Sequence, residues 1–231
     1  MEQLLNGFTL NIPKGVFPLS TDSMVLADFV KLPASARVLD LGAGCGTLGV
    51  LLCARDAGCR VTGIELDDIA HTAALENIER NGLEHRLTSI CGDLRSVNRL
   101  FPAGGFHCCI SNPPYFSGGP AARLTLARRD DCCSISQLFE GAAWSLRYGG
   151  DFFLVHKPER LAELCACGSA VGLEPKRLRL VRHQEGGPIA LILLQCRKGG
   201  KPGLVIEEMS LRRSDGTATE DYQRIYHIQE D

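Results

Sequence analysis

Four short apolar runs in the first half of the chain, each followed by a helical pattern, constrain the fold more than any other feature. The runs cover residues 37–41, 60–64, 87–91 and 106–110. Of the helical stretches after them, residues 67–81 form the longest, and a glycine at position 82 follows it. Strands that alternate with helices in this way form right-handed βαβ units, with the strands parallel in one sheet and helices on both faces.

The second half of the sequence extends this sheet. A fifth strand is expected over residues 151–156, and two more over residues 177–182 and 189–196, joined by a turn short enough for antiparallel pairing. The sequence therefore predicts an α/β fold, a Rossmann-like doubly wound, mostly parallel seven-stranded sheet that ends in an antiparallel hairpin. We expect a single domain over residues 1–231.

Both ends of the chain carry further elements. Ser20-Thr21-Asp22 provides caps for a first helix, which we expect to end near Leu32-Pro33. Residues 1–33 would then form a lead-in followed by a helix that covers the mouth of the site at the ends of the strands. In residues 203–231 we expect a short strand near Leu204–Ile206 and a final helix that starts at the capping-box pattern Thr217-Ala218-Thr219-Glu220.

Polar residues follow the predicted strands where each one ends. The first strand, which contains Asp40, leads into the turn Gly42-Ala43-Gly44-Cys45-Gly46, where a ligand can approach the backbone at a helix N-terminus. The next three strands end in Glu65, Asp93 and Asn112. Because ligands of open α/β sheets bind beyond the carboxyl ends of the strands, these residues should line one crevice. A carboxylate after the second strand suits two ribose hydroxyls, and Asp93 suits an adenine amino group.

The fourth strand ends in the segment Asn112-Pro113-Pro114-Tyr115, which we call the arch. Its prolines cannot donate backbone hydrogen bonds, and each pushes the residue before it into an extended conformation. The arch can therefore present the Asn112 side-chain oxygen, the Pro113 carbonyl and the Tyr115 ring towards one point. Two acceptors and an aromatic face suit a planar group with an NH2, such as the edge of adenine. An ordinary turn is the alternative for this tetrapeptide alone.

Taken together, these residues resemble a known family. The glycine turn with Asp40, the strand-end residues Glu65 and Asp93, and the arch are similar to the motif set of class I S-adenosylmethionine-dependent methyltransferases that modify amino nitrogens. The wider chain, from Gly7-Phe8 to Ile225-Tyr226, resembles the tRNA (adenine-N6)-methyltransferase family that acts on a valine tRNA.

This resemblance implies S-adenosyl-L-methionine as the cofactor and tRNA or another structured RNA as the partner, with no metal. The implied cofactor-binding residues are Asp40, Gly42, Gly44, Gly46, Glu65, Leu66, Asp93, Leu94 and Asn112. The implied catalytic residues are Asn112, Pro113, Pro114 and Tyr115. Substrate binding is expected of Tyr115, Phe116, Arg128, Arg129, Arg177 and Arg179. The family tends to have Ala-Arg-His-Glu after the arch, whereas this chain has Ala127-Arg128-Arg129-Asp130, a change that bears on activity and target choice.

With a formal net charge of −2, the chain has to meet RNA through a local basic surface. Between positions 176 and 201 there are seven Lys and Arg residues and one acid, Glu185. Arg177 and Arg179 alternate along a strand and could form a wall that contacts phosphates, with affinity that falls with salt. A solubilising strand face is the alternative.

Other functions remain open from the sequence. Gly44 to Gly49 also satisfies the dinucleotide fingerprint of a dehydrogenase, which would leave the arch unexplained. A protein glutamine methyltransferase or a DNA amino-methyltransferase could use the same arch, but a recognition domain is expected in those enzymes and only 39 residues precede Asp40. A non-catalytic RNA-binding module is a further alternative, if Arg129-Asp130 has disabled the site.

Cysteine usage and the absence of apolar spans favour a cytoplasmic protein. The 11 cysteines contain no Cys-x-x-Cys pair, and most lie inside apolar runs, so we interpret them as reduced core residues. No run approaches the ~20 apolar residues of a membrane span, and we expect no targeting leader at Met1-Glu2-Gln3-Leu4.

Overall fold

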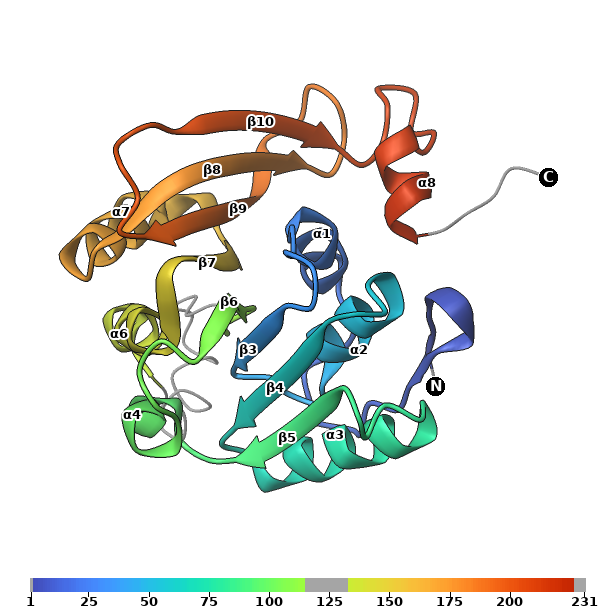
Figure 1. The fold of residues 1–231 in the computed structure, drawn as a ribbon. Coiled ribbons are helices and arrows are strands. Elements are labelled where there is room, and N and C mark those ends of the chain that lie inside the picture. Colours follow the sequence, from blue (N-terminus) through green and yellow to red (C-terminus); the bar gives the residue numbers. More distant parts are fainter. Residues whose placement is uncertain (1, 115–132, 227–231) are drawn as a thin grey trace.

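A central sheet with helices on both faces forms the fold of the computed structural model, which describes residues 2–114 and 133–226 (Figure 1). Its strands are β3 (Arg37–Leu41), β4 (Arg60–Glu65), β5 (Leu87–Cys91), β6 (Phe106–Ser111), β7 (Leu146–His156), β8 (Leu173–Arg182), β9 (Ile189–Lys198) and β10 (Val205–Ser210). Their order across the sheet is β10-β8-β9-β7-β6-β3-β4-β5. In the lead-in, β1 (Glu2–Gln3) and β2 (Thr9–Leu10) form a separate antiparallel pair.

The pairing of the strands confirms the doubly wound fold. β3 pairs in parallel with β4 and β6, and β5 and β7 extend these pairs in parallel on either side. β9 is antiparallel to β7 and to β8, which confirms the predicted hairpin. Within the described residues the large sheet has eight strands instead of seven. The additional strand is β10, which contains the C-terminal strand candidate and pairs in parallel with β8 at the edge.

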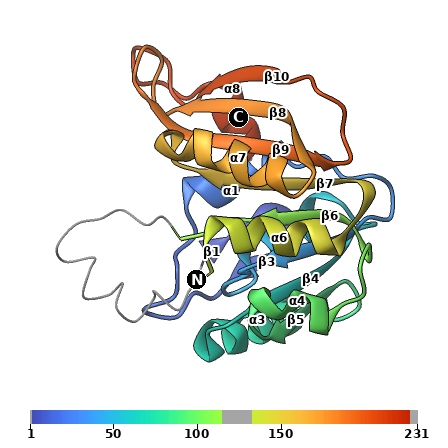
Figure 2. The same ribbon diagram turned by 90° about the vertical axis from the view of Figure 1, so that its left-hand side faces the viewer.

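Helices cover both faces of this sheet. They are α1 (Thr21–Phe29), α2 (Thr47–Arg55), α3 (Asp68–Arg80), α4 (Val97–Leu100), α6 (Ile135–Ser145), α7 (Leu161–Ala170) and α8 (Glu220–Tyr226), with 3-10 turns η1 (Leu5–Gly7), η2 (Leu94–Ser96) and η3 (Pro158–Arg160). Figure 2 shows α4, α6 and α7 on the face turned towards the viewer. The hydrophobic core has two clusters, one on each face of the sheet. Buried side chains of α4, α6 and α7 belong to one cluster, and buried side chains of α1, α2 and α3 belong to the other.

Strand β7 shows why the central strands are apolar throughout. Its side chains alternate between the two faces, so Phe153 and Val155 belong to one core cluster, and Phe152 and Leu154 to the other. All four are fully buried. Each such side chain stabilises the fold by roughly 1.5–3 kcal/mol relative to exposure. A strand covered on both faces needs this continuous apolar run.

Capping residues set where the predicted helices begin. The Ser20 side chain accepts a hydrogen bond from the Ser23 N–H at the start of α1, as expected. Asp67 caps α3 in the same way. The last helix begins later than the capping box predicted, because the Thr219 hydroxyl accepts the Tyr222 N–H and α8 starts at Glu220.

The described residues were searched for membrane-spanning helices and for groups of side chains that could bind a metal ion. In residues 2–114 and 133–226, no helix is long and apolar enough to cross a bilayer. The same residues contain no group of three or more His, Cys, Asp or Glu side chains arranged to hold a metal ion. Their cysteines are free thiols, and most of these are buried in the core.

Candidate active site

The polar residues predicted to line one crevice follow strands that end at the same edge of the sheet. Leu41 of β3 pairs with Ile64 of β4, which pairs with Ile90 of β5, so these three strands end level. β6 lies beside β3 in parallel and ends at the same side. Glu65 is the last residue of β4, and the glycine turn at residues 42–46, Asp93 and Asn112 follow the ends of β3, β5 and β6.

Backbone hydrogen bonds fold the glycine turn against the end of β4. The Gly42 and Ala43 N–H groups both donate to the Ile64 carbonyl, at 3.0 and 2.9 Å. Gly46 is the N-cap residue of α2 with a φ of 83°, in the left-handed region that favours glycine. The turn therefore brings bare backbone to the edge of the sheet, where a ligand can approach it closely.

Glu65 is held in place by its neighbours' backbone. Its Oε2 accepts the Gly44 N–H at 2.7 Å, and its Oε1 accepts the Asp67 N–H at 2.8 Å. Each carboxylate oxygen keeps a further lone pair, so the side chain can still accept bonds from a pair of hydroxyls. The next residue, Leu66, is 50% exposed and leaves an apolar surface beside this carboxylate.

Asp40 is buried beneath the glycine turn. The residue is 1% exposed, and neither carboxylate oxygen has a hydrogen-bond partner in the described part of the chain. Gly46, Gly63 and Ser89 line the small space around it. Burial, aided by the negative charge of Glu65, raises the pKa of Asp40 to about 8. The carboxyl is therefore largely protonated near neutral pH.

Asp93 is engaged with the turn that follows it. Its Oδ1 accepts the Arg95 N–H at 2.8 Å, and its Oδ2 accepts the Arg95 Nε–H at 2.8 Å. These hydrogen bonds from Arg95 hold the pKa of Asp93 below its usual value. The neighbouring Leu94 packs half-buried against the core cluster on the α6 side.

The arch begins with an asparagine whose amide is held at one end. The Ser111 hydroxyl donates to the Leu41 carbonyl at 2.7 Å and ties the end of β6 to β3. The Asn112 Nδ2 donates to the Ser23 Oγ of α1 at 3.1 Å. Its Oδ1 is buried and has no partner among residues 2–114 and 133–226. The Asn112 oxygen is thus an acceptor available to a donor.

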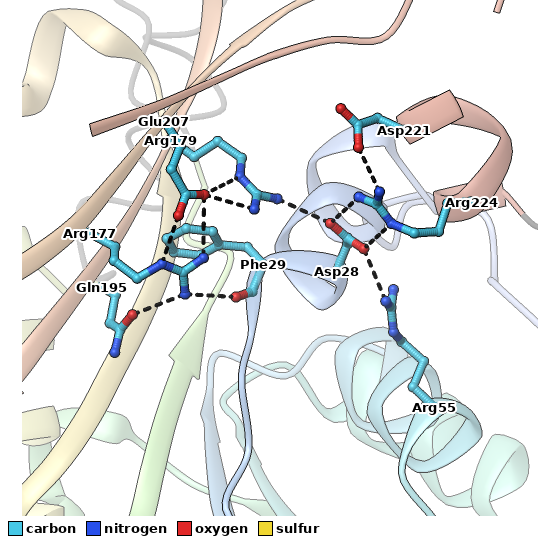
Figure 3. Close-up of polar contacts among 9 residues, drawn as sticks. All are labelled: Asp28, Phe29, Arg55, Arg177, Arg179, Gln195, Glu207, Asp221 and Arg224. Atoms are coloured by element: carbon cyan, nitrogen blue, oxygen red, sulfur yellow. Dashed lines mark hydrogen bonds and ion pairs between the residues drawn. The ribbon is translucent and has the colours of Figure 1, made fainter. Parts of the chain in front are cut away.

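Arg177 and Arg179, which are predicted to contact RNA, take part in ion pairs within the fold. Their side chains are only 13% and 15% exposed. Both pair with Glu207 of β10, at 3.1 and 2.8 Å, and the Arg177 guanidinium lies 4.3 Å from the centre of the Phe29 ring (Figure 3). The two arginines face one side of β8, as expected, but on that side they contact Phe29 and Asp28 of α1 and Glu207 of the neighbouring strand β10.

Asp28 is the centre of the same charge network, which we call the Asp28 cluster. Arg55 of α2, Arg179 of β8 and Arg224 of α8 lie 3.0, 3.1 and 3.1 Å from its carboxylate (Figure 3). Burial alone would raise the pKa of Asp28, but hydrogen bonds from Arg224 and Arg55 hold it below its usual value. Four elements are joined at this one carboxylate.

The remaining predicted substrate residues lie outside the described part of the chain. These are Tyr115, Phe116, Arg128 and Arg129. Conversely, Ser23 and Asp28 were not identified from the sequence as contributors to the site. Both are polar residues on the buried side of α1, where they interrupt an otherwise apolar helix face. A polar residue on a buried face was the available signal that these side chains have polar partners.

The parallel sheet with a glycine turn after β3 and an acidic residue at the end of β4 is the arrangement of Rossmann-like enzymes, and the comparisons with known proteins place this chain among the methyltransferases of that class. The model of the methyltransferase small domain family matches residues 9–164, and the chain belongs to this family. Two solved structures share the fold. A predicted O-methyltransferase of Agrobacterium tumefaciens aligns at a TM-score of 0.75 with 20% identity, over 90% of this chain and 96% of that one. A precorrin-6y C5,15-methyltransferase of Geobacter metallireducens aligns at a TM-score of 0.60 with 12% identity, over 82% and 94%.

Curated relatives match most of the chain. A protein of Tolumonas auensis is 31% identical over 220 residues, which cover 93% of this chain and 90% of the relative. Another, from Bacteroides fragilis, is 30% identical over 184 residues, or 78% and 77%. Both carry the name tRNA1(Val) (adenine(37)-N6)-methyltransferase.

Proposed function

We propose that this protein transfers a methyl group from S-adenosylmethionine to the N6 amino nitrogen of an adenine in tRNA. The observation that carries the proposal is the buried side-chain oxygen of Asn112, an acceptor that has no partner within the described residues and follows β6 at the edge of the crevice. The names of the Tolumonas auensis and Bacteroides fragilis relatives support the same activity. A tRNA substrate would place the protein in the cytoplasm.

The crevice fits the proposed cofactor. Bound S-adenosylmethionine supplies a methyl group on a positively charged sulfur. The exposed backbone of Gly42 and the half-buried backbone of Gly44, with Gly46 buried behind them, would accept its close approach. The free lone pairs of Glu65 would bind the ribose hydroxyls. The apolar surface of Leu66 would contact the cofactor's adenine.

Two further carboxyl groups would act on the same ligand, Asp93 at the edge of the sheet and Asp40 from beneath the glycine turn. Asp93, beside Leu94, would accept a hydrogen bond from the adenine amino group through lone pairs that Arg95 leaves free. Asp40 is a buried carboxyl without a partner among the described residues. A cationic amino group close to it would lower its pKa and favour its ionised form.

On the acceptor side, the arch would activate the amino nitrogen of the substrate. That nitrogen is a weak nucleophile because its lone pair is delocalised into the adenine ring. The Asn112 Oδ1 and the Pro113 carbonyl would accept its two N–H bonds, and Pro114 keeps the arch stiff. These hydrogen bonds strengthen as the nitrogen gains positive charge, so they stabilise the transition state more than the bound substrate. The rest of the catalysis would come from positioning.

The proposal for the RNA contacts is based on the sequence. Tyr115 and Phe116 would stack on an unpaired or flipped adenine, and Arg128 and Arg129 would contact the RNA backbone. All four lie outside the described residues.

The proposal is tested by supplying labelled S-adenosylmethionine with total tRNA, total protein or duplex DNA in separate reactions. Each product is then digested and the labelled unit identified by chromatography and mass spectrometry. We expect label in N6-methyladenosine from the tRNA reaction. Label recovered only as methylglutamine from the protein reaction would contradict the proposal and assign the arch to a protein carboxamide. Label only in DNA would assign the site to a different nucleic acid.

A further inference from the structure

The contact between α1 and the arch leaves the two ends of one amide in different states. The Asn112 Nδ2 donates to the Ser23 Oγ at 3.1 Å, whereas the Oδ1 of the same amide is buried and without a partner in the part of the chain described. Ser23 itself is 3% exposed, so solvent does not compete strongly for its hydroxyl. The serine therefore holds the donor end of the amide and leaves the acceptor end free.

The orientation of this amide decides what it can bind. Rotation of an asparagine amide by a half turn exchanges its NH2 group and its oxygen, which have nearly the same shape. With the NH2 group turned to the crevice, Asn112 would present donors to the N–H donors of an amino substrate. The Ser23 hydroxyl holds one end of the amide and so fixes the plane of the group. After a half turn this hydroxyl could donate to the amide oxygen instead, but the NH2 group at the other end would then be buried and unpaired, which favours the observed orientation.

We propose that Ser23 is a positioning residue that orients the Asn112 amide so that its oxygen faces the substrate amino group. This inference rests on the proposed function and adds to it a residue that touches neither substrate nor cofactor. Ser23 acts through Asn112 alone, so it affects the chemical step and not cofactor binding.

Helix α1 is fixed firmly enough to give Ser23 this role. Asp28, at the opposite end of α1, is 6% exposed and pairs with arginines of α2, β8 and α8. Between them, Val25 and Leu26 are fully buried, and the Phe29 ring packs edge-on against Phe153 at 6.0 Å between centroids. The helix cannot shift along the sheet without breaking these contacts, so the Ser23 hydroxyl stays in place.

The first experiment compares Ser23→Ala with Ser145→Ala. Ser145 is a matched control, because it is also fully buried and its hydroxyl has no hydrogen-bond partner among the residues described. We expect Ser23→Ala to lower kcat about 10-fold, the effect of one hydrogen bond of ordinary strength, with an unchanged Kd for S-adenosylmethionine. Ser145→Ala should keep the wild-type kcat and Kd. A wild-type kcat in Ser23→Ala would overturn the positioning role.

The second experiment separates the hydroxyl from the shape of the side chain. Thr and Val have nearly the same volume, and only Thr keeps an oxygen that can accept from Asn112. We expect Ser23→Thr to retain a kcat several-fold above that of Ser23→Val. Equal kcat values for the two variants, together with an undiminished kcat in Ser23→Ala, would leave Ser23 as a packing residue only.

A third readout does not depend on activity. In the ¹⁵N spectrum, the side-chain amide of Asn112, assigned by its loss in Asn112→Asp, should shift in Ser23→Ala and stay unchanged in Ser145→Ala. If the wild-type protein methylates none of the three acceptors, the proposed function fails while this signal still tests the orientation of the amide. An amide signal that is the same in Ser23→Ala and wild type would overturn the inference in either case.

Discussion

The side-chain oxygen of Asn112 is the acceptor on which the proposed reaction depends. Replacing the residue in Asn112→Ala removes this oxygen and leaves the glycine turn and Glu65 in place. We expect kcat to fall by at least about 100-fold, the scale seen when a polar group that stabilises a transition state is removed. The Kd for S-adenosylmethionine, measured by calorimetry, should stay within a few-fold of wild type.

Asn98→Ala is the matched control, since Asn98 is an exposed asparagine on the short helix α4. It should leave both kcat and Kd unchanged. Activity close to wild type in Asn112→Ala would remove the arch from the mechanism.

The buried carboxyl of Asp40 should make stability depend on pH. Its pKa is near 3.8 in an exposed setting and about 8 in the folded protein, where it is buried close to the negative charge of Glu65. Because the folded state holds this proton more tightly, the contribution of Asp40 to stability is greatest below pH 4 and is lost as the pH rises towards 8. Asparagine at position 40 has no proton to lose in this pH range, so the free-energy cost of ionising a buried carboxyl group disappears.

We therefore expect Asp40→Asn, without ligand, to melt at a higher temperature than wild type at pH 8, with the difference shrinking towards pH 4. A gain of 1 kcal/mol raises Tm by about 2–4 °C in a protein of this size, so the shift at pH 8 should be at least that large. Glu159→Gln, an equal charge change at an exposed position, should show no such trend. Parallel melting profiles for Asp40→Asn and wild type from pH 4 to 8 would contradict the prediction.

The residues at the strand ends could be predicted from the sequence, whereas the partners of their side chains could not. Glu65 and Asn112 follow apolar runs directly, so the local pattern places them at the edge of the sheet. The Asn112 partner Ser23 lies 89 positions away and depends on how α1 docks. The ion pairs of Arg177 and Arg179 could not be predicted for the same reason, because their acidic partners belong to α1 and β10.

Among the elements, α1 depends on the Asp28 cluster for its position. Asp28→Ala would leave the guanidinium groups of Arg55, Arg179 and Arg224 close together without their shared carboxylate. Removing one partner of a buried ion pair costs about 3–5 kcal/mol. We expect a loss near the lower end, measured by chemical denaturation, because Arg224 is 51% exposed.

The control for this prediction is Asp221→Ala. Asp221 also pairs with Arg224, at 2.6 Å, but its side chain is 38% exposed. An exposed pair of this kind contributes about 0.5 kcal/mol or less. Equal losses for Asp28→Ala and Asp221→Ala would show that burial of the cluster adds nothing to stability.

Over the whole molecule, we propose that residues 1–231 form one cooperative domain. Ile225 of α8 is fully buried and belongs to the same core cluster as residues of α1 and β7. Ile225→Ala should lower the unfolding free energy by about 2–4 kcal/mol through lost burial and the cavity left behind. Glu220→Ala, at an exposed position of the same helix, should change it by no more than about 0.5 kcal/mol.

The only tryptophan, Trp144, lies on α6 and reports from the other face of the sheet. In Ile225→Ala, the fluorescence transition of Trp144 and the far-ultraviolet circular dichroism transition should move together, as two-state unfolding requires. Separate transitions would divide the chain into two folding units and contradict the single domain.

The overall fold followed from the sequence because its central strands are apolar on both faces and helical patterns follow them along the chain. The strand count was one too low because Leu204, Val205 and Ile206 are exposed at 45%, 58% and 60%. An edge strand with one neighbour does not show the alternation or burial of an inner strand. β10 pairs with β8 along its backbone, and the ion pairs of Glu207 with Arg177 and Arg179 accompany this pairing.

The Asp28 cluster also bears on how the protein is made. Asp28 and Arg224 are 196 positions apart, so a ribosome adding roughly 5–20 residues per second places them about 10–40 s apart. During that time the α1 carboxylate lacks one of its three cations, and β8 with Arg179 also emerges late. We therefore expect α1, and the serine that it holds against the arch, to reach its final position only after the last helix has left the ribosome. The catalytic edge of the sheet then matures only after α8 has been synthesised.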